Sequence, residues 1–143
     1  MTLKNGTMTP TICIVHFNTP ALTAAEVKSI RLHCGEDWRI VIFENSDVEP
    51  LPKDDAITII DNTRQQLVNF DEEIRRHPRR RTDKACYGRS VFGSVKHSMS
   101  VEWLVQNMPG PFILADSDIL VKAQTSTILP LKGKMATIGQ TLK

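Results

Sequence analysis

Four short apolar runs, each stopped by polar residues, constrain the fold of this 143-residue chain most strongly. They cover residues 11–17, 38–43, 56–60 and 111–115. Runs of this length, rich in Val and Ile, are typical of strands in buried parallel sheets. Residues 19–33 have helical spacing, and Gly35 follows them as a helix-ending residue. A strand, a helix and a strand joined by short connections predict a right-handed parallel unit.

The first helix has two alternative starts, and a second helix is predicted before the last strand. Thr19 followed by Pro20, or a capping box at residues 23–26, would begin the first helix. Residues 94–108 again show helical spacing of apolar side chains. We therefore expect one α/β domain over residues 1–143, with helices covering a Rossmann-like, three-layer parallel sheet. The strand in the last apolar run is expected to be buried on both faces.

Polar residues follow the predicted strands, and those after the last strand are Asp116, Ser117 and Asp118. Open α/β sheets bind ligands at this carboxyl edge. Two carboxylates there, completed by phosphate oxygens, suit a divalent cation such as Mg²⁺. Asp also favours turns, and an Asp-x-Asp sequence is common by chance, so the pair has a purely structural interpretation as well.

Four segments resemble, in order and spacing, the amino-terminal half of glycosyltransferases of the GT-A fold, in particular family 2 and its relatives. They are residues 14–20 (IVHFNTP), 42–47 (IFENSD), 93–97 (GSVKH) and 112–118 (FILADSD). The resemblance implies a GT-A type of parallel sheet. It also implies that the carboxyl edge binds a nucleoside-diphosphate sugar, a UDP- or GDP-sugar, together with Mn²⁺ or Mg²⁺.

The resemblance further assigns roles to single residues. Phe17 matches an aromatic residue that stacks on the base, and Glu44 matches an acid that accepts a hydrogen bond from the base. Asp116 would contact the ribose or the metal, and Asp118 would hold the metal. The residues assigned to the phosphate side are basic: Arg89, Lys96 and His97.

Most of these residues also have a structural interpretation. Phe17 ends a predicted strand and could belong to the core. Glu44 opens a sequence with good turn chemistry. His97 suits a half-buried position near the start of a helix. The functional roles and the structural ones are therefore both open from the sequence.

The resemblance implies a glycosyltransferase that acts on an unknown carbohydrate or lipid-linked acceptor. In that family the acceptor pocket and the general base lie beyond the segments matched here, and no Asp or Glu occurs from residue 119 to residue 143. We therefore expect a fragment or a truncated form whose catalytic base is supplied elsewhere. The alternative is a non-catalytic nucleotide-binding or assembly module that retains the fold.

A basic loop is expected at residues 71–90. Residues 75–89 carry seven Arg and Lys against the single Asp83, although the net charge of the whole chain is only +2. The loop could be a solvated surface, a lid over diphosphate, or a peripheral contact to anionic lipid. Nucleic acid is not expected as a partner, because Tyr87 is the only aromatic residue within that basic stretch.

The remaining expectations concern location and assembly. No apolar stretch approaches a membrane span, and residues 1–10 have no apolar core of the kind that a signal peptide needs. Three widely spaced cysteines favour reduced thiols in a cytoplasmic protein. An incomplete sheet would leave an exposed edge, so a homo-oligomer is also expected.

Overall fold

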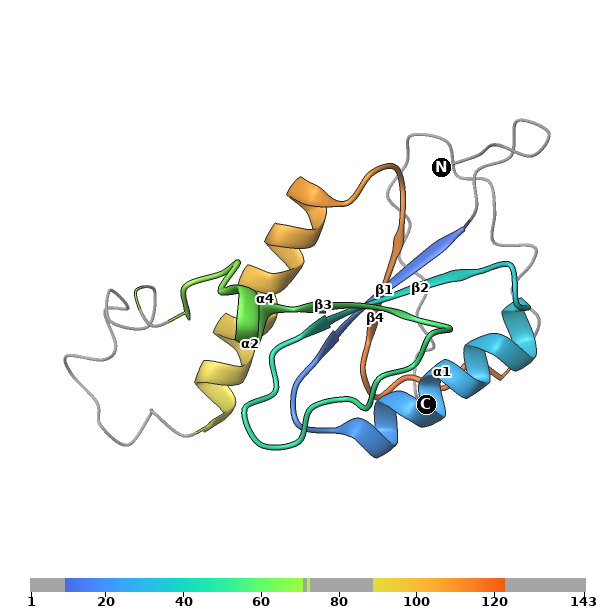
Figure 1. Cartoon of the computed structure of the whole chain (residues 1–143), viewed down its shortest axis with the longest axis horizontal. Coiled ribbons are helices and arrows are strands. Elements are labelled where there is room, and N and C mark those ends of the chain that lie inside the picture. The colour runs from blue at the N-terminus through green and yellow to red at the C-terminus, as the bar shows by residue number, and fades with distance from the viewer. Residues whose placement is uncertain (1–9, 71, 73–88, 123–143) are drawn as a thin grey trace, which may run out of the picture.

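The structure, a computed structural model, describes residues 10–70, 72 and 89–122. In this part of the chain, four parallel strands form one sheet in the order β3-β2-β1-β4 (Figure 1). The described elements are β1 (Thr11–His16), α1 (Pro20–Cys34), β2 (Arg39–Glu44), β3 (Thr58–Asp61), α2 (Asn62–Gln65), α4 (Arg89–Asn107) and β4 (Ile113–Asp116). The predicted α/β class with a parallel sheet is confirmed, and the arrangement is consistent with a Rossmann-like fold.

One long helix covers each face of the sheet (Figure 1). Ile14 of β1 belongs to the hydrophobic core that includes Ile30 of α1. The next residue, Val15, belongs to the core that includes Leu104 of α4. This alternation follows from the pleat of the strand, and each fully buried aliphatic side chain contributes about 1.5–3 kcal/mol. The described chain therefore has three layers, with the sheet between α1 and α4.

The order of the strands reverses at β1, since β2 and β3 lie on one side of it and β4 on the other. The register pairs Val15 with Asp116 across β1 and β4, and His16 with Glu44 across β1 and β2. The carboxyl ends of β1 and β4 therefore lie side by side. In open α/β sheets such a switch point is the usual place for a ligand.

The expectation that the last strand is buried on both faces is wrong. Burial along β4 alternates between half-buried and exposed residues, and Leu114 is 40% exposed. The reason is the position of β4 at the edge of the described sheet, where it pairs with β1 alone. The apolar run indicated a strand correctly, but it could not indicate the place of that strand in the order.

Of the two alternative starts for the first helix, the earlier one is observed. Thr19 is the N-cap residue of α1 and Pro20 occupies its first turn, although the Thr19 side chain makes no capping hydrogen bond. Thr23 and Glu26, the two ends of the predicted capping box, instead lie inside α1 and are buried. The packing of this helix face against the sheet therefore overrides a local capping signal.

The second long helix begins earlier than its periodicity predicts. α4 starts at Arg89, whereas the sequence places the start near Ser94. Gly93 lowers the local helix propensity by about 1 kcal/mol relative to Ala, which weakens the sequence signal there. Extending an existing helix is much less costly than nucleating one, so the extra turn follows from the long segment after it.

The first helix ends at Gly35 in a conformation that requires glycine. Its φ is +95° and its ψ is 168°, and an added Cβ would meet no atom within 4 Å. Gly35→Ala is therefore expected to lower the free energy of unfolding through backbone strain alone, by about 1–3 kcal/mol. Urea denaturation would measure this, with the exposed Lys28→Ala in the same helix as a control. Unchanged stability of Gly35→Ala would contradict this backbone conformation.

Two predicted segments lie outside the described residues. These are most of the basic loop, at residues 71 and 73–88, and a short strand predicted at residues 135–138. In the described part of the chain, no helix combines the length and the apolar character that crossing a membrane requires.

Candidate functional site

The candidate site lies at the carboxyl ends of β1 and β4, where side chains of α4 contact residues from both strand ends. The ammonium nitrogen of Lys96 lies 4.7 Å from the centre of the Phe17 ring, just after β1. The next residue, His97, has its Nε2 atom 3.5 Å from Oδ1 of Asp116, at the end of β4. Phe17, His97 and Asp116, three of the residues predicted to form the site, are therefore brought together through one turn of α4.

Alternation along the strands explains why these side chains meet on the α4 face. Phe112 of the segment before β4 packs in the core under α4, whereas Ala115 packs in the core under α1. Asp116 follows Ala115 and therefore points toward α4. Its side chain is 64% exposed, so its carboxylate is accessible to a ligand as well as to His97.

Asp118 lies in the turn after β4, and its charge also raises the pKa of Glu26, a residue of α1. The turn is closed by a hydrogen bond from the Ile119 N–H to the Asp116 carbonyl, and Asp118 is exposed. Among the described residues, no three His, Cys, Asp or Glu side chains are placed to hold a metal ion together. Asp116 and Asp118 are thus two acids at one edge, without a third protein ligand of these kinds in the described chain.

Glu26, from α1, is a third acid near this pair. It is only 1% exposed, and neither of its carboxyl oxygens has a hydrogen-bond partner among the described residues. Burial raises the pKa of Glu26, and the charges of Asp118 and Asp116 raise it further, to about 8. The hydroxyl of Thr23, one turn earlier, is also buried and has no hydrogen-bond partner in the part of the chain that the structure describes. Glu26 is therefore mainly neutral at pH 7, and its burial lowers the free energy of unfolding.

Glu44 occupies a different environment from the one that base recognition requires. It is 3% exposed, and its two oxygens accept hydrogen bonds from the backbone N–H groups of Ser46 (2.7 Å) and Leu51 (2.8 Å). The Nδ1 atom of His16 lies 2.9 and 3.0 Å from the same two oxygens. Burial raises the pKa of Glu44, but these hydrogen bonds outweigh it and lower the pKa to about 2.

The His16 ring is oriented by hydrogen bonds at both of its nitrogens. The backbone N–H of Thr19 donates to Nε2 at 3.1 Å, so Nε2 carries the lone pair. Nδ1 therefore carries the proton and donates a hydrogen bond to the Glu44 carboxylate. Ser46 completes the network, because its hydroxyl lies 3.0 Å from Nδ1 and accepts the backbone N–H of Asn18 at 2.8 Å. This buried network fixes the loop that presents Phe17.

The predicted role of Glu44 is ligand binding, whereas in the structure its side chain pairs with His16. His16 is the last residue of β1 and Glu44 the last residue of β2, whereas the apolar runs in the sequence end at Phe17 and Phe43. Parallel strands in that register place the two side chains next to each other on one face. Aligning the ends of the runs would place His16 opposite Ile42, so the pair depends on a register that the apolar pattern does not specify.

A second buried network holds α4 against the ends of β2 and β3. The side-chain amide of Asn45 donates to the Ser100 hydroxyl at 2.8 Å, and Asn62 donates to the Asn45 carbonyl at 3.1 Å. The Ser100 hydroxyl also donates to the backbone carbonyl of Lys96 at 2.7 Å. The turn of α4 that carries Lys96 is therefore tied to the sheet by side chains that sequence reasoning left unassigned.

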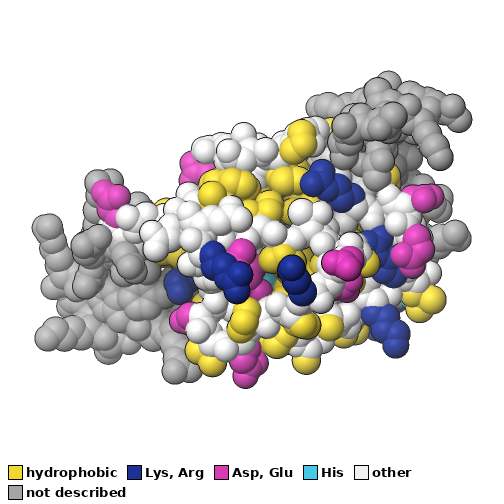
Figure 2. Space-filling view, in the orientation of Figure 1, with side chains coloured by type: hydrophobic (Ala, Val, Ile, Leu, Met, Phe, Trp, Pro, Cys, Tyr) yellow, Lys and Arg dark blue, Asp and Glu magenta, His cyan; other side chains and the backbone are white. Residues whose placement is uncertain are grey.

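Arg89, the last residue predicted for the phosphate side, is the first residue of α4, and its side chain lies outside the described part of the structure. The face of the molecule seen in Figure 2 shows acidic and basic side chains interspersed over the described residues. No protein-family model, curated protein or solved structure matches this chain. What supports a function is therefore the arrangement of side chains at the carboxyl edge.

Proposed function

We propose that the carboxyl edge between β1 and β4 binds a nucleoside-diphosphate sugar together with Mn²⁺ or Mg²⁺. In this proposal the chain is the donor-binding part of a glycosyltransferase with a GT-A type of sheet. The observation that carries the proposal is the pairing of Lys96 with Phe17 and of His97 with Asp116. An aromatic side chain, two basic side chains and an acidic side chain meet at the switch point of a parallel sheet, where such ligands bind.

The side chains suit the parts of this ligand. Phe17 is 37% exposed, and stacking of a base on an aromatic ring is worth about 1–3 kcal/mol. Lys96 and His97 bring positive charge or N–H donors to the same edge, as a diphosphate requires. Glu44 receives no role in base binding here, because protein donors occupy both of its oxygens.

The residues at the end of β4 fit the predicted cation. Mg²⁺ is commonly held by one or two carboxylates, with phosphate oxygens and water completing its shell, and two acids are the number that this edge offers. The oxygens of both residues are hard ligands and both side chains are exposed. When bound, such a cation neutralises the negative charge that develops on a departing diphosphate.

A non-catalytic nucleotide-binding module is the second candidate. Inverting transfer needs a carboxylate base beside the acceptor, and residues 119–143 contain no Asp or Glu. Both candidates require nucleotide binding. They differ in whether the chain releases or transfers the sugar of a UDP- or GDP-sugar, which product analysis by chromatography would measure.

Removing the second acid of the pair tests the cation site. Asp118→Ala is expected to abolish the part of the affinity for UDP or GDP that depends on Mn²⁺, because one of two carboxylate ligands is lost. Isothermal titration calorimetry with and without Mn²⁺ would measure it. Asp37→Ala, an exposed acid between α1 and β2, serves as the matched control. If the parent protein binds neither nucleotide in either condition, the proposed function is refuted.

A further inference from the structure

Lys96 is a charged residue whose ammonium group lies over two aromatic rings. Its ammonium nitrogen lies 4.7 Å from the centre of the Phe17 ring and 5.8 Å from the centre of the Phe70 ring. In the described part of the chain, this ammonium makes two ring contacts and no ion pair with a carboxylate. The neighbouring His97, in contrast, is directed at Asp116.

The two rings hold the Lys96 ammonium only weakly, so the ammonium is available to a ligand at the candidate site. A cation over an aromatic face is worth about 0.5–1 kcal/mol at an exposed site, which is far less than a desolvated ion pair. The Lys side chain is a point charge on a flexible stem, so the ammonium can leave the rings while its backbone stays in place. The backbone of Lys96 is itself fixed, because its carbonyl accepts the Ser100 hydroxyl and Ser100 is bonded to Asn45.

Lys96 covers one face of the Phe17 ring, and this is the face on which the base stacks in our proposal. An ammonium and a base cannot share one ring face. A ligand that stacks there must displace Lys96, and a ligand that also carries phosphate offers the displaced charge a stronger partner. A nucleoside without phosphate displaces the same ammonium and offers it nothing in return.

We propose that Lys96 is a specificity-determining residue that rests on the rings of Phe17 and Phe70 in the empty site and moves to the diphosphate when a base stacks on Phe17. The inference rests on the proposed function and adds to it a reason for choosing nucleoside diphosphates over nucleosides. The exchange adds a phosphate contact for the diphosphate, whereas for the nucleoside it only removes a ring contact.

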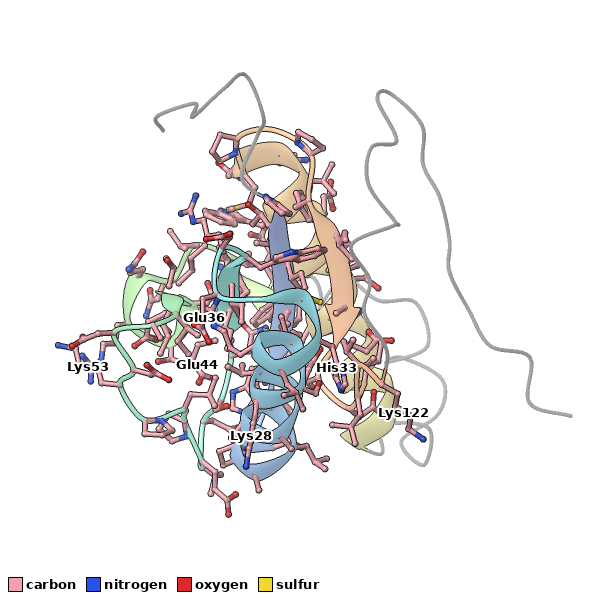
Figure 3. All side chains as sticks on the ribbon, turned by 90° about the vertical axis from the view of Figure 1, so that its right-hand side faces the viewer. Lys28, His33, Glu36, Glu44, Lys53 and Lys122 are labelled. Carbon is pink, nitrogen blue, oxygen red and sulfur yellow. The ribbon has the colours of Figure 1, made fainter. Side chains whose placement is uncertain are left out.

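Lys96→Met separates the two effects, because Met keeps an unbranched side chain over the rings without the charge. Calorimetry would compare UDP with uridine and GDP with guanosine, with Lys28→Met as the control. Lys28 is an exposed lysine of α1, on the opposite side of the sheet (Figure 3). Lys96→Met is expected to weaken diphosphate binding about tenfold, which corresponds to about 1.4 kcal/mol. Nucleoside binding should stay equal or become tighter, and Lys28→Met should change neither.

A spectroscopic measurement follows the movement itself. Protons above an aromatic face are shifted upfield, so the ε-methylene signals of Lys96 should be upfield of those of the other lysines in the empty protein. They should return to the ordinary position when the diphosphate is added. Lys96→Met identifies these signals by their loss, and Lys28→Met should leave them in place.

The possible outcomes distinguish this inference from the proposed function. If the parent binds diphosphate but Lys96→Met binds it equally well, the inference is overturned and the proposed function stands. Equal losses for diphosphate and nucleoside, or Lys96 signals that stay upfield in the complex, overturn it as well. If the parent binds no nucleotide at all, both fail together.

Discussion

Glu44→Gln is expected to lower the free energy of unfolding by about 3 kcal/mol at pH 7, because charge-assisted hydrogen bonds are lost and a buried backbone N–H is left without an acceptor. Both oxygens of Glu44 accept backbone N–H groups, from Ser46 and Leu51, and both lie within hydrogen-bond distance of His16. A Gln side chain has one acceptor oxygen. In either orientation its NH₂ group therefore faces a backbone N–H.

The same substitution should remove a pH dependence. The pKa of Glu44 is lowered from 4.5 to about 2 in the folded protein. A lowered folded pKa stabilises the fold above the unfolded pKa, and the stabilisation is lost as the pH falls from about 4.5 to about 2. The shift corresponds to about 3 kcal/mol at 1.36 kcal/mol per pKa unit, which agrees with the cost of the mutation.

Urea denaturation of the parent and of Glu44→Gln at several pH values between 7 and 3 would measure both effects. The difference between the two proteins should shrink as the pH falls. Glu49→Gln, an exposed acid five residues later, is the matched control and should change stability by less than about 0.5 kcal/mol. A constant difference between parent and Glu44→Gln over this range would contradict the low pKa.

Glu26→Gln is expected to have the opposite effect and to stabilise the protein. The pKa of Glu26 is raised from 4.5 to about 8, first by burial and then by the charges of Asp118 and Asp116. Between these two pH values the unfolded chain is ionised while the folded chain must keep its proton. Stability therefore falls as the pH rises from about 4.5 to about 8, and it is constant above that.

The expected gain for Glu26→Gln follows from this window. It is about 3 kcal/mol at pH 7 and less than about 1 kcal/mol at pH 5, at 1.36 kcal/mol per unit of separation from the unfolded pKa. Thermal or urea denaturation in a metal-free buffer would measure it. Thr23→Val is a matched variant, since it removes the neighbouring buried hydroxyl, which no described residue contacts by a hydrogen bond. Its gain, about 1–3 kcal/mol, should not depend on pH. A pH-independent gain for Glu26→Gln would contradict the raised pKa.

The parallel sheet was predictable from the sequence because strands covered by helices on both faces need nearly continuous apolar runs. β1 and β2 illustrate this, with almost every residue buried. The position of β4 was not predictable in the same way. An edge strand can be as apolar as a central one, and the sequence does not contain the pairing that left Leu114 exposed.

The candidate site was predictable in its location but not in its connections. Polar residues after several parallel strands indicated one edge of the sheet, and Phe17 and Asp116 do lie at that edge. The contacts of Lys96 and His97 depend on how α4 crosses the sheet, which no local pattern specifies. Glu26 was unpredictable for the same reason, because the charges that raise its pKa belong to Asp116 and Asp118, at the end of β4 and just after it, rather than to its own helix.

Paramagnetic broadening tests the central claim most directly, because it reports where a cation and a nucleotide bind together. Substoichiometric Mn²⁺ would be added to the ¹⁵N-labelled protein with UDP or GDP. The amide signals of residues 17–19 and 116–118 should broaden first. Those of residues 35–39, at the amino end of β2, should persist. Broadening centred on any other surface, or none beyond that of free Mn²⁺, would contradict a nucleotide site between β1 and β4.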